Sequence, residues 1–302
     1  MKSNIISILI VISTFLACLL FSSSIVDKSM YIVGFFYDYM FPSLLPLLIS
    51  IFILIDTGVL YYISYFLQYI TLPLFRINGY GALCIILSIL TGFPFSTLFV
   101  CKFYKSNKIS KEEAYSLILS FTIPSFSFMF TTIKSNLNNN DFLLLISCIY
   151  LSSFILLFIT SRILIKQYTF ITFKEIHMST YESIKCYSFP ISLKQNIIKI
   201  TESLSVILGT MVYFSILSLF IESILPISNT VKGILEFSFP SIVVAKNNDL
   251  ISLIIILSFS SISCIFQCSC ILEEYNLKTK PLSLSKVSQV LISCLIFTIK
   301  KL

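Results

Sequence analysis

Polar side chains gather beside two Phe-Pro pairs that interrupt apolar stretches of the chain. The first pair lies in Gly92-Phe93-Pro94 and the second is Phe239-Pro240. Proline removes a helical hydrogen bond, and backbone freed at membrane depth is tolerated only inside protein or against a water-filled cavity. Polar groups at such breaks can bind a small solute, and the half-helix N-terminus beyond each proline favours an anionic group.

The candidate solute-binding residues lie at both breaks and in the helices that follow them. In the first half they are Gly92, Pro94, Ser96, Thr97, Ser120 and Thr122. In the second half they are Glu236, Ser238, Ser258, Ser260 and Gln267. Helix–helix packing is the alternative role for each serine, because small hydroxyl residues are common between membrane helices.

Glu236 stands out among these residues because a carboxylate in an apolar stretch is costly and is a functional hypothesis by default. It could bind a cation or carry a proton. The alternative is a structural pairing with Lys232, four residues earlier. Asp56 and Glu222 are similar but lie nearer to the expected ends of membrane spans, so they are weaker candidates.

Composition places these residues in a membrane. Of 302 residues, 57% are hydrophobic and 12% are charged, whereas soluble domains are about half apolar and roughly a quarter charged. Only two of the 21 basic residues are arginine, which argues against a nucleic-acid partner. Enzyme motifs and a glycine-rich phosphate cradle are missing, so neither an enzyme nor a cofactor is expected.

The nine cysteines do not indicate a disulfide scaffold or a metal site. Cys264, Cys268 and Cys270 alone have ligand-like spacing, and the single histidine, His177, is distant in sequence. A metal site needs more ligands than this cluster offers. Helix packing is therefore the expected role of these cysteines.

Segment lengths predict an all-α polytopic membrane protein with about seven spans and two re-entrant hairpins. The spans are expected at 4–26, 42–67, 113–133, 142–163, 203–225, 250–271 and 282–299, and the hairpins at 82–101 and 233–245. The helix 113–133 is expected to be interrupted at Thr122-Ile123-Pro124-Ser125. The first span could instead be a signal peptide, although its apolar run is long for one. Ser110 and Glu113 have capping-box spacing, which predicts a helix start.

An inverted repeat follows from the order of the segments. Each half has a Phe-Pro break and then an Ile-Leu-Ser-Phe patch, at 118–121 and 256–259. A topology with a cytoplasmic N-terminus places fourteen basic residues inside and six outside, which obeys the positive-inside rule. The resulting divisions are 1–41 (first membrane helix and interfacial segment), 42–163 (first repeat), 164–202 (polar cytoplasmic loop) and 203–302 (second repeat).

Several motifs occur in an order and spacing that match a known family over most of the chain. They are Phe41-Pro42-Ser43-Leu44-Leu45-Pro46, Pro73-Leu74-Phe75-Arg76, Gly92-Phe93-Pro94, Lys111-Glu112-Glu113-Ala114, Ser120-Phe121-Thr122, Gly233-Ile234-Leu235-Glu236, Ser258-Phe259-Ser260, Gln267 and Lys280-Pro281-Leu282. With these motifs the chain resembles the YlbJ (SpoVV) family of sporulation integral membrane proteins, which carries the nucleoside-recognition Gate domain and is similar to concentrative nucleoside transporters.

The resemblance implies a bacterial transporter, located in the outer forespore membrane, that moves dipicolinic acid during spore formation. Its expected partners are a small-molecule solute and the lipid bilayer, with a homo-oligomer left open. The alternatives are a non-transporting membrane protein needed for spore envelope assembly and a nucleoside-type transporter. The chain departs from the family pattern at Ser96-Thr97-Leu98, at Ile123-Pro124-Ser125 and at Ser261-Ile262-Ser263-Cys264. These departures imply altered selectivity or a lost transport function.

Overall fold

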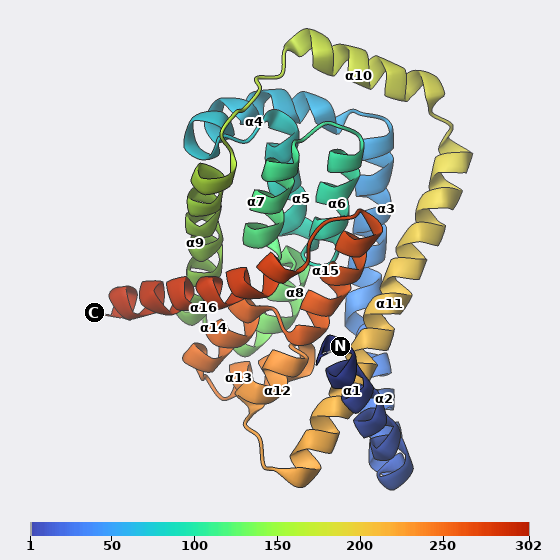
Figure 1. The fold of residues 1–302 in the computed structure, drawn as a ribbon, viewed down its shortest axis with the longest axis vertical. Helices are drawn as coiled ribbons and strands as arrows, with labels where there is room; N and C mark the ends of the chain where they lie inside the picture. Colours follow the sequence, from blue (N-terminus) through green and yellow to red (C-terminus); the bar gives the residue numbers. More distant parts are fainter. Residues whose placement is uncertain (1, 302) are drawn as a thin grey trace.

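The computed structural model describes the backbone of residues 2–301 and the side chains of residue 8 and residues 11–301. Every regular element in this range is helical (Figure 1), which confirms the all-α fold. Six helical segments of the described chain are long and apolar enough to cross a membrane. The protein is therefore a polytopic integral membrane protein.

The helices follow one another through short connections. Those of the first half are α1 (Lys2–Leu20), α2 (Ser22–Phe35), a π-helical stretch η1 (Phe36–Met40), α3 (Phe41–Asp56), α4 (Leu60–Phe75), α5 (Gly79–Thr91), α6 (Phe95–Lys105), α7 (Lys111–Phe121), α8 (Phe126–Phe128), η2 (Met129–Ile133), η3 (Lys134–Asn136) and α9 (Asn139–Leu164). Those of the second half are α10 (Phe173–Cys186), α11 (Phe189–Ile224), α12 (Asn229–Leu235), α13 (Ser238–Lys246), α14 (Leu250–Phe259), α15 (Ile262–Glu274) and α16 (Lys280–Lys301).

Two long rods form one side of the molecule. The first rod runs without a break from α2 through η1 to α3, and the second is α11, which lies beside it (Figure 1). The short helix α1 packs against both rods near the end where α11 finishes. We call that end the lower end, and the end that carries α4 and α10 the upper end, as they appear in Figure 1.

The first expected hairpin is present. Helices α5 and α6 pack side by side and are joined by Gly92-Phe93-Pro94. The start of α5 meets the segment that follows α6, because the Asn78 amide donates to the Lys108 carbonyl (2.9 Å) and the Asn78 backbone N–H donates to Glu113 (2.8 Å). Both arms therefore open at the upper end, and the tip points into the molecule.

The second hairpin opens at the lower end (Figure 1). Helices α12 and α13 pack together, and the hydroxyls of Thr230 and Ser252 lie 2.9 Å apart, which brings the start of α12 to the start of α14. The break lies at Glu236 and Phe237, not at the expected Phe239-Pro240. Proline is tolerated in the first turn of a helix, where its missing N–H has no intrahelical partner, so Pro240 lies inside α13.

A broken helix follows each hairpin. The helix after the first hairpin stops at Phe121 and resumes at Phe126, as the sequence predicts. The expected unbroken span 250–271 is wrong, because α14 ends at Phe259 and α15 begins at Ile262. Ser260 and Ser261 both have positive φ (67° and 60°) at this break. Each half thus contains a long rod, a hairpin, a broken helix and an unbroken helix, and the two hairpins enter from opposite ends.

Three expectations for the N-terminal part of the chain are wrong, namely the interfacial segment 27–41 and the separate spans 4–26 and 42–67. The segment 27–41 is helical and belongs to the first rod, so the expected spans 4–26 and 42–67 are replaced by α1, one long rod and α4. Glycine permits the turn after α3, since Gly58 has φ +72°. The pair α4–α5 bends by 94° and counts as a seventh span only if taken as one crossing.

The segment 164–202 is not a loop. It contains α10 and the first turns of α11. Its polar residues are accommodated by partners: Ser192 and Asn196 are buried on the carboxylate of Asp56. Helix α16 is present as expected, but it lies across the bundle, and Lys300 reaches Ser147 of α9 (2.7 Å) (Figure 1).

Two contacts join basic segments of the chain. Arg76 donates to the Ile165 carbonyl (3.1 Å), and the Lys105 ammonium lies 5.6 Å from the centre of the Tyr275 ring. They link the end of α4 to the segment after α9, and the end of α6 to the end of α15. The capping box at Ser110 and Glu113 is present as well.

We predict that Gly92→Ala destabilises the protein by about 3 kcal/mol or more, because backbone strain adds to a clash. Gly92 has φ +65°, and a Cβ atom there would lie 2.3 Å from the backbone nitrogen of Ser125. Thermal unfolding in detergent followed by circular dichroism measures the effect.

Gly209→Ala is the matched control. Nothing lies within 4 Å of its added Cβ, and the position is inside α11. Alanine there is expected to stabilise the protein by about 0.5–1 kcal/mol. Equal melting temperatures for the two variants would contradict the packed hairpin tip.

Candidate functional site

The tips of the two hairpins meet inside the protein. The rings of Phe93 and Phe237 lie edge to face with their centres 5.1 Å apart. Phe128, in α8 just after the break in the first broken helix, contacts Phe237 at the same distance. Elements that enter from opposite ends therefore share one apolar contact at the centre.

The two broken helices surround this contact. The Phe93 backbone N–H donates to the Ile123 carbonyl (3.0 Å), which ties the first tip to the first break. The Ser260 hydroxyl donates to the Thr122 carbonyl (2.9 Å), which ties the two breaks together. Backbone groups freed by the breaks thus pair with one another, as an apolar environment requires.

The side chain of Lys286, in α16, reaches this junction. It is fully buried, and its ammonium donates to the Thr122 carbonyl and to the Gln289 side chain (2.6 Å). Gln289 in turn donates to the Ser153 hydroxyl of α9 (2.8 Å). Neither ion pair formed by the described residues includes Lys286. A buried ammonium without a carboxylate is costly, and an anion bound beside it would offset that cost.

Several hydroxyls near the tips are buried without a hydrogen-bond partner. They are those of Ser96, Thr97, Thr122 and Ser258. The Thr97 hydroxyl has the Cys268 thiol as a neighbour, and a thiol is only a weak hydrogen-bonding group. Buried polar groups are nearly always paired, so these hydroxyls are free to donate to a ligand.

The space at the junction is small. A cavity of about 20 Å³ lies between Phe93, Phe237, Ser125, Cys264 and Gln267, among others. Such a volume accommodates about one water molecule. The hairpin tips are therefore closely packed at the junction.

Glu236 occupies the break of the second hairpin, on the lower side of the junction. Its carboxylate accepts from the Ser238 backbone N–H (3.0 Å) and from the Ser238 hydroxyl (2.7 Å). Lys232 does not pair with it, because its ammonium binds Glu222 (2.5 Å). A cavity of about 90 Å³ leads to Glu236 past Lys28 and Phe239. The carboxylate therefore borders a cavity that Lys28 and Lys232 also line.

The structure brings most of the sequence-predicted residues together. Gly92, Pro94, Thr122 and Ser260 form the junction, and Gln267 lines its cavity while donating to Thr210 (2.5 Å). Ser238 belongs with Glu236.

Ser120 is not part of the junction. Its hydroxyl donates to the Ser116 carbonyl (2.8 Å) and contacts Thr160 of α9 (3.3 Å), so helix packing explains it.

Sequence reasoning missed Lys286. Its charge lies inside an expected span, and an ionisable residue in such a position is a functional hypothesis by default. The topology count assigned Lys286 to neither side of the membrane, which hid that signal. Cys264 and Cys268 are buried free thiols, and the described residues contain no group of three or more His, Cys, Asp or Glu side chains that could hold a metal ion.

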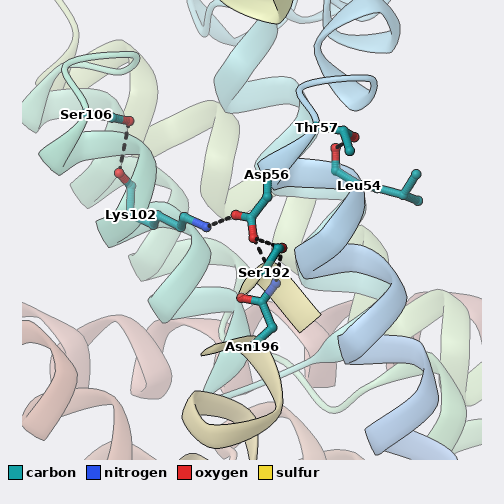
Figure 2. Close-up of polar contacts among 7 residues, drawn as sticks. All are labelled: Leu54, Asp56, Thr57, Lys102, Ser106, Ser192 and Asn196. Carbon is teal, nitrogen blue, oxygen red and sulfur yellow. Dashed lines mark hydrogen bonds and ion pairs between the residues drawn. The ribbon is translucent and has the colours of Figure 1, made fainter. Parts of the chain in front are cut away.

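A polar cluster at the upper end anchors the first hairpin to the two rods (Figure 2). Asp56, the last residue of α3, accepts from Lys102 of α6 (3.1 Å) and from Ser192 (2.7 Å) and Asn196 (2.8 Å) of α11. At the lower end Glu222 of α11 pairs with Lys232 of α12. Each hairpin is thus joined to a rod by one ion pair.

No family model, no curated protein and no solved structure matches the chain.

We predict that Lys286→Met keeps or raises the stability of the protein, by up to about 4 kcal/mol, because replacing a buried charge by an apolar side chain of similar size removes a desolvation cost. The Thr122 carbonyl keeps Ser260 as a donor. Thermal unfolding in detergent provides the measurement. A large loss of stability would show that the ammonium has a structural role.

Proposed function

We propose that the protein is a membrane transporter of a small anionic solute, which binds at the junction of the two hairpin tips. The observation that carries the proposal is Lys286, a fully buried ammonium that no carboxylate of the described residues pairs with, at the place where both tips and both broken helices meet. In a medium of low dielectric constant, such a charge attracts an anion far more strongly than it would in water.

Groups of the first hairpin also support an oxyanion as the ligand. The unpaired hydroxyls of Ser96 and Thr97 lie in the first turn of α6, where the backbone N–H groups of a helix also favour negative charge. The Phe93 and Phe237 rings offer apolar contact to a flat solute. By resemblance, the solute is dipicolinic acid during spore formation, an aromatic dicarboxylate that satisfies both requirements.

The inverted arrangement of the hairpins supports alternating access. Transporters with inverted repeats bind their substrate between the repeats near the middle of the membrane. Here each hairpin closes the junction from one end, and each is joined to a rod by one ion pair. Opening one hairpin at a time would expose the solute to one side of the membrane only.

Glu236 supplies a charge of the opposite sign on the lower side of the junction. A proton or cation bound there would move together with the anion and reduce the net charge that crosses the membrane. Two ionisable groups of opposite charge, Lys286 and Glu236, therefore share the task of carrying charge through the apolar core.

Uptake of labelled dipicolinate into proteoliposomes tests the proposal. We predict that Lys286→Met lowers the uptake rate at least tenfold, since a charged hydrogen bond to the solute contributes about 1.5–3 kcal/mol. Lys286→Arg retains the charge and should retain part of the uptake.

Lys246→Met is the matched control, because Lys246 is an exposed lysine at the end of α13. Its uptake should equal that of the unmodified protein. No uptake by the unmodified protein, or equal uptake by Lys286→Met, would overturn the proposal.

Two further variants test the contributions of the hairpins. Glu236→Gln and Ser96→Leu are each expected to abolish dipicolinate uptake, the first by removing the titratable charge and the second by filling the junction. Size-exclusion chromatography in detergent checks that both variants remain folded. Normal uptake by both variants would favour a non-transporting role in envelope assembly.

A further inference from the structure

A second, larger cavity lies at the upper end, away from the hairpin tips. It measures about 370 Å³, a volume typical of a small-molecule site. Its walls include Tyr61 of α4, Lys102 and Phe103 of α6, Lys108 of the following loop, and Ser179 and Glu182 of α10. None of these residues contributes to the junction described above.

Helix α10 forms one wall of this cavity and is firmly attached. Thr180 is buried and donates its hydroxyl proton to the Gly58 carbonyl (3.1 Å), and Ile176 is fully buried. The Tyr62 hydroxyl and the His177 Nδ1 atom lie 2.9 Å apart. The cavity is therefore an open depression lined by packed elements and is not a gap beside a loose segment.

Lys108 is held in place without an ion pair. Its ammonium lies 3.3 Å from the centre of the Tyr61 ring and 4.8 Å from that of Tyr80. The backbone of the loop is fixed as well, because the Lys108 carbonyl accepts from Asn78 (2.9 Å) and the Lys108 N–H donates to the Phe103 carbonyl (3.0 Å). The side chain thus has a defined position and free N–H donors.

Lys102 provides the second charge. Asp56 binds it at 3.1 Å, and Ser192 and Asn196 fix Asp56 in turn (Figure 2). The positive charge of Lys102 repels the positive charge of Lys108. Two positioned ammonium groups on one cavity have the arrangement expected of an oxyanion site.

We infer that this cavity binds a small oxyanion, a carboxylate, sulfate or phosphate group, between Lys102 and Lys108. The site is independent of the proposed transport site at Lys286. Glu182 is exposed at the rim and attracts Lys108, so it competes with the ligand. The oxyanion comes either from a free solute or from the head group of an anionic lipid.

The charge of Lys108 gives the site a pH dependence of known sign. Burial lowers the pKa of Lys108 to about 8, and the groups that face it are Tyr61, Tyr80, Lys102 and Glu182. The charged form binds the anion, so binding is present below pH 8 and falls as the pH rises above it. Between pH 7 and pH 9 the charged fraction falls about tenfold.

The chain contains no tryptophan, so a single introduced one reports on the cavity. Ser106 is exposed and lines the cavity, which makes Ser106→Trp a suitable reporter. In neutral detergent we expect sulfate, which stays a dianion throughout this pH range, to change its fluorescence saturably. Tyr168→Trp, exposed at the same end but outside the cavity wall, should show no such change.

Charge variants in the Ser106→Trp protein test the assignment. Lys108→Met should weaken sulfate binding about tenfold or more, and Glu182→Gln should tighten it about two- to fivefold. Lys108→Arg should bind equally at pH 7 and pH 9, because arginine stays charged.

Nanodiscs distinguish the two sources of the oxyanion. Sulfate binding in phosphatidylcholine nanodiscs that persists when phosphatidylglycerol is added assigns the site to a free solute. Binding that phosphatidylglycerol abolishes assigns it to a lipid head group. Absence of saturable binding in phosphatidylcholine, or binding that Lys108→Met leaves unchanged, overturns the inference. Neither result bears on uptake through Lys286.

Discussion

The Thr122 carbonyl joins the parts of this protein that meet at its centre. It lies at a helix break in a buried position and accepts from the Ser260 hydroxyl and from the Lys286 ammonium. A carbonyl in such surroundings must find donors within the protein. One group of the first half is thereby bonded to two elements of the second half, and the hairpin tips pack around that link.

The same constraint accounts for the architecture. A membrane helix can be interrupted only where its freed backbone groups are satisfied, so breaks are stable when they are placed against one another. The breaks at 122–125 and 260–261 and the tips at Gly92 and Phe237 meet in this way. A site with unpaired hydroxyls and one unpaired charge results, and the rods α2–α3 and α11 support it from one side.

Residues with strong local signals could be predicted from the sequence. Pro94 and Gly92 marked the first tip, the Thr122–Ser125 segment marked a break, and Ser110 with Glu113 marked a helix start. The break at Ser260 and Ser261 contains neither glycine nor proline, and tertiary contacts stabilise its left-handed backbone. Helix α10 and the polar start of α11 were hidden because their polar residues find partners such as Asp56, which no local pattern reveals. Lys286 was masked for a similar reason, since its partners Thr122 and Gln289 become neighbours only in the fold.

The most direct test of anion binding between the hairpin tips is a structure determined with a bromine-substituted aromatic dicarboxylate, since anomalous scattering from bromine locates the anion. We expect the dicarboxylate to contact the Lys286 ammonium, with the Phe93 and Phe237 rings separated around it. Bromine density confined to other parts of the protein, with Lys286 still bonded to Thr122 and Gln289 and the tips still in contact, would show that the anion does not bind at Lys286.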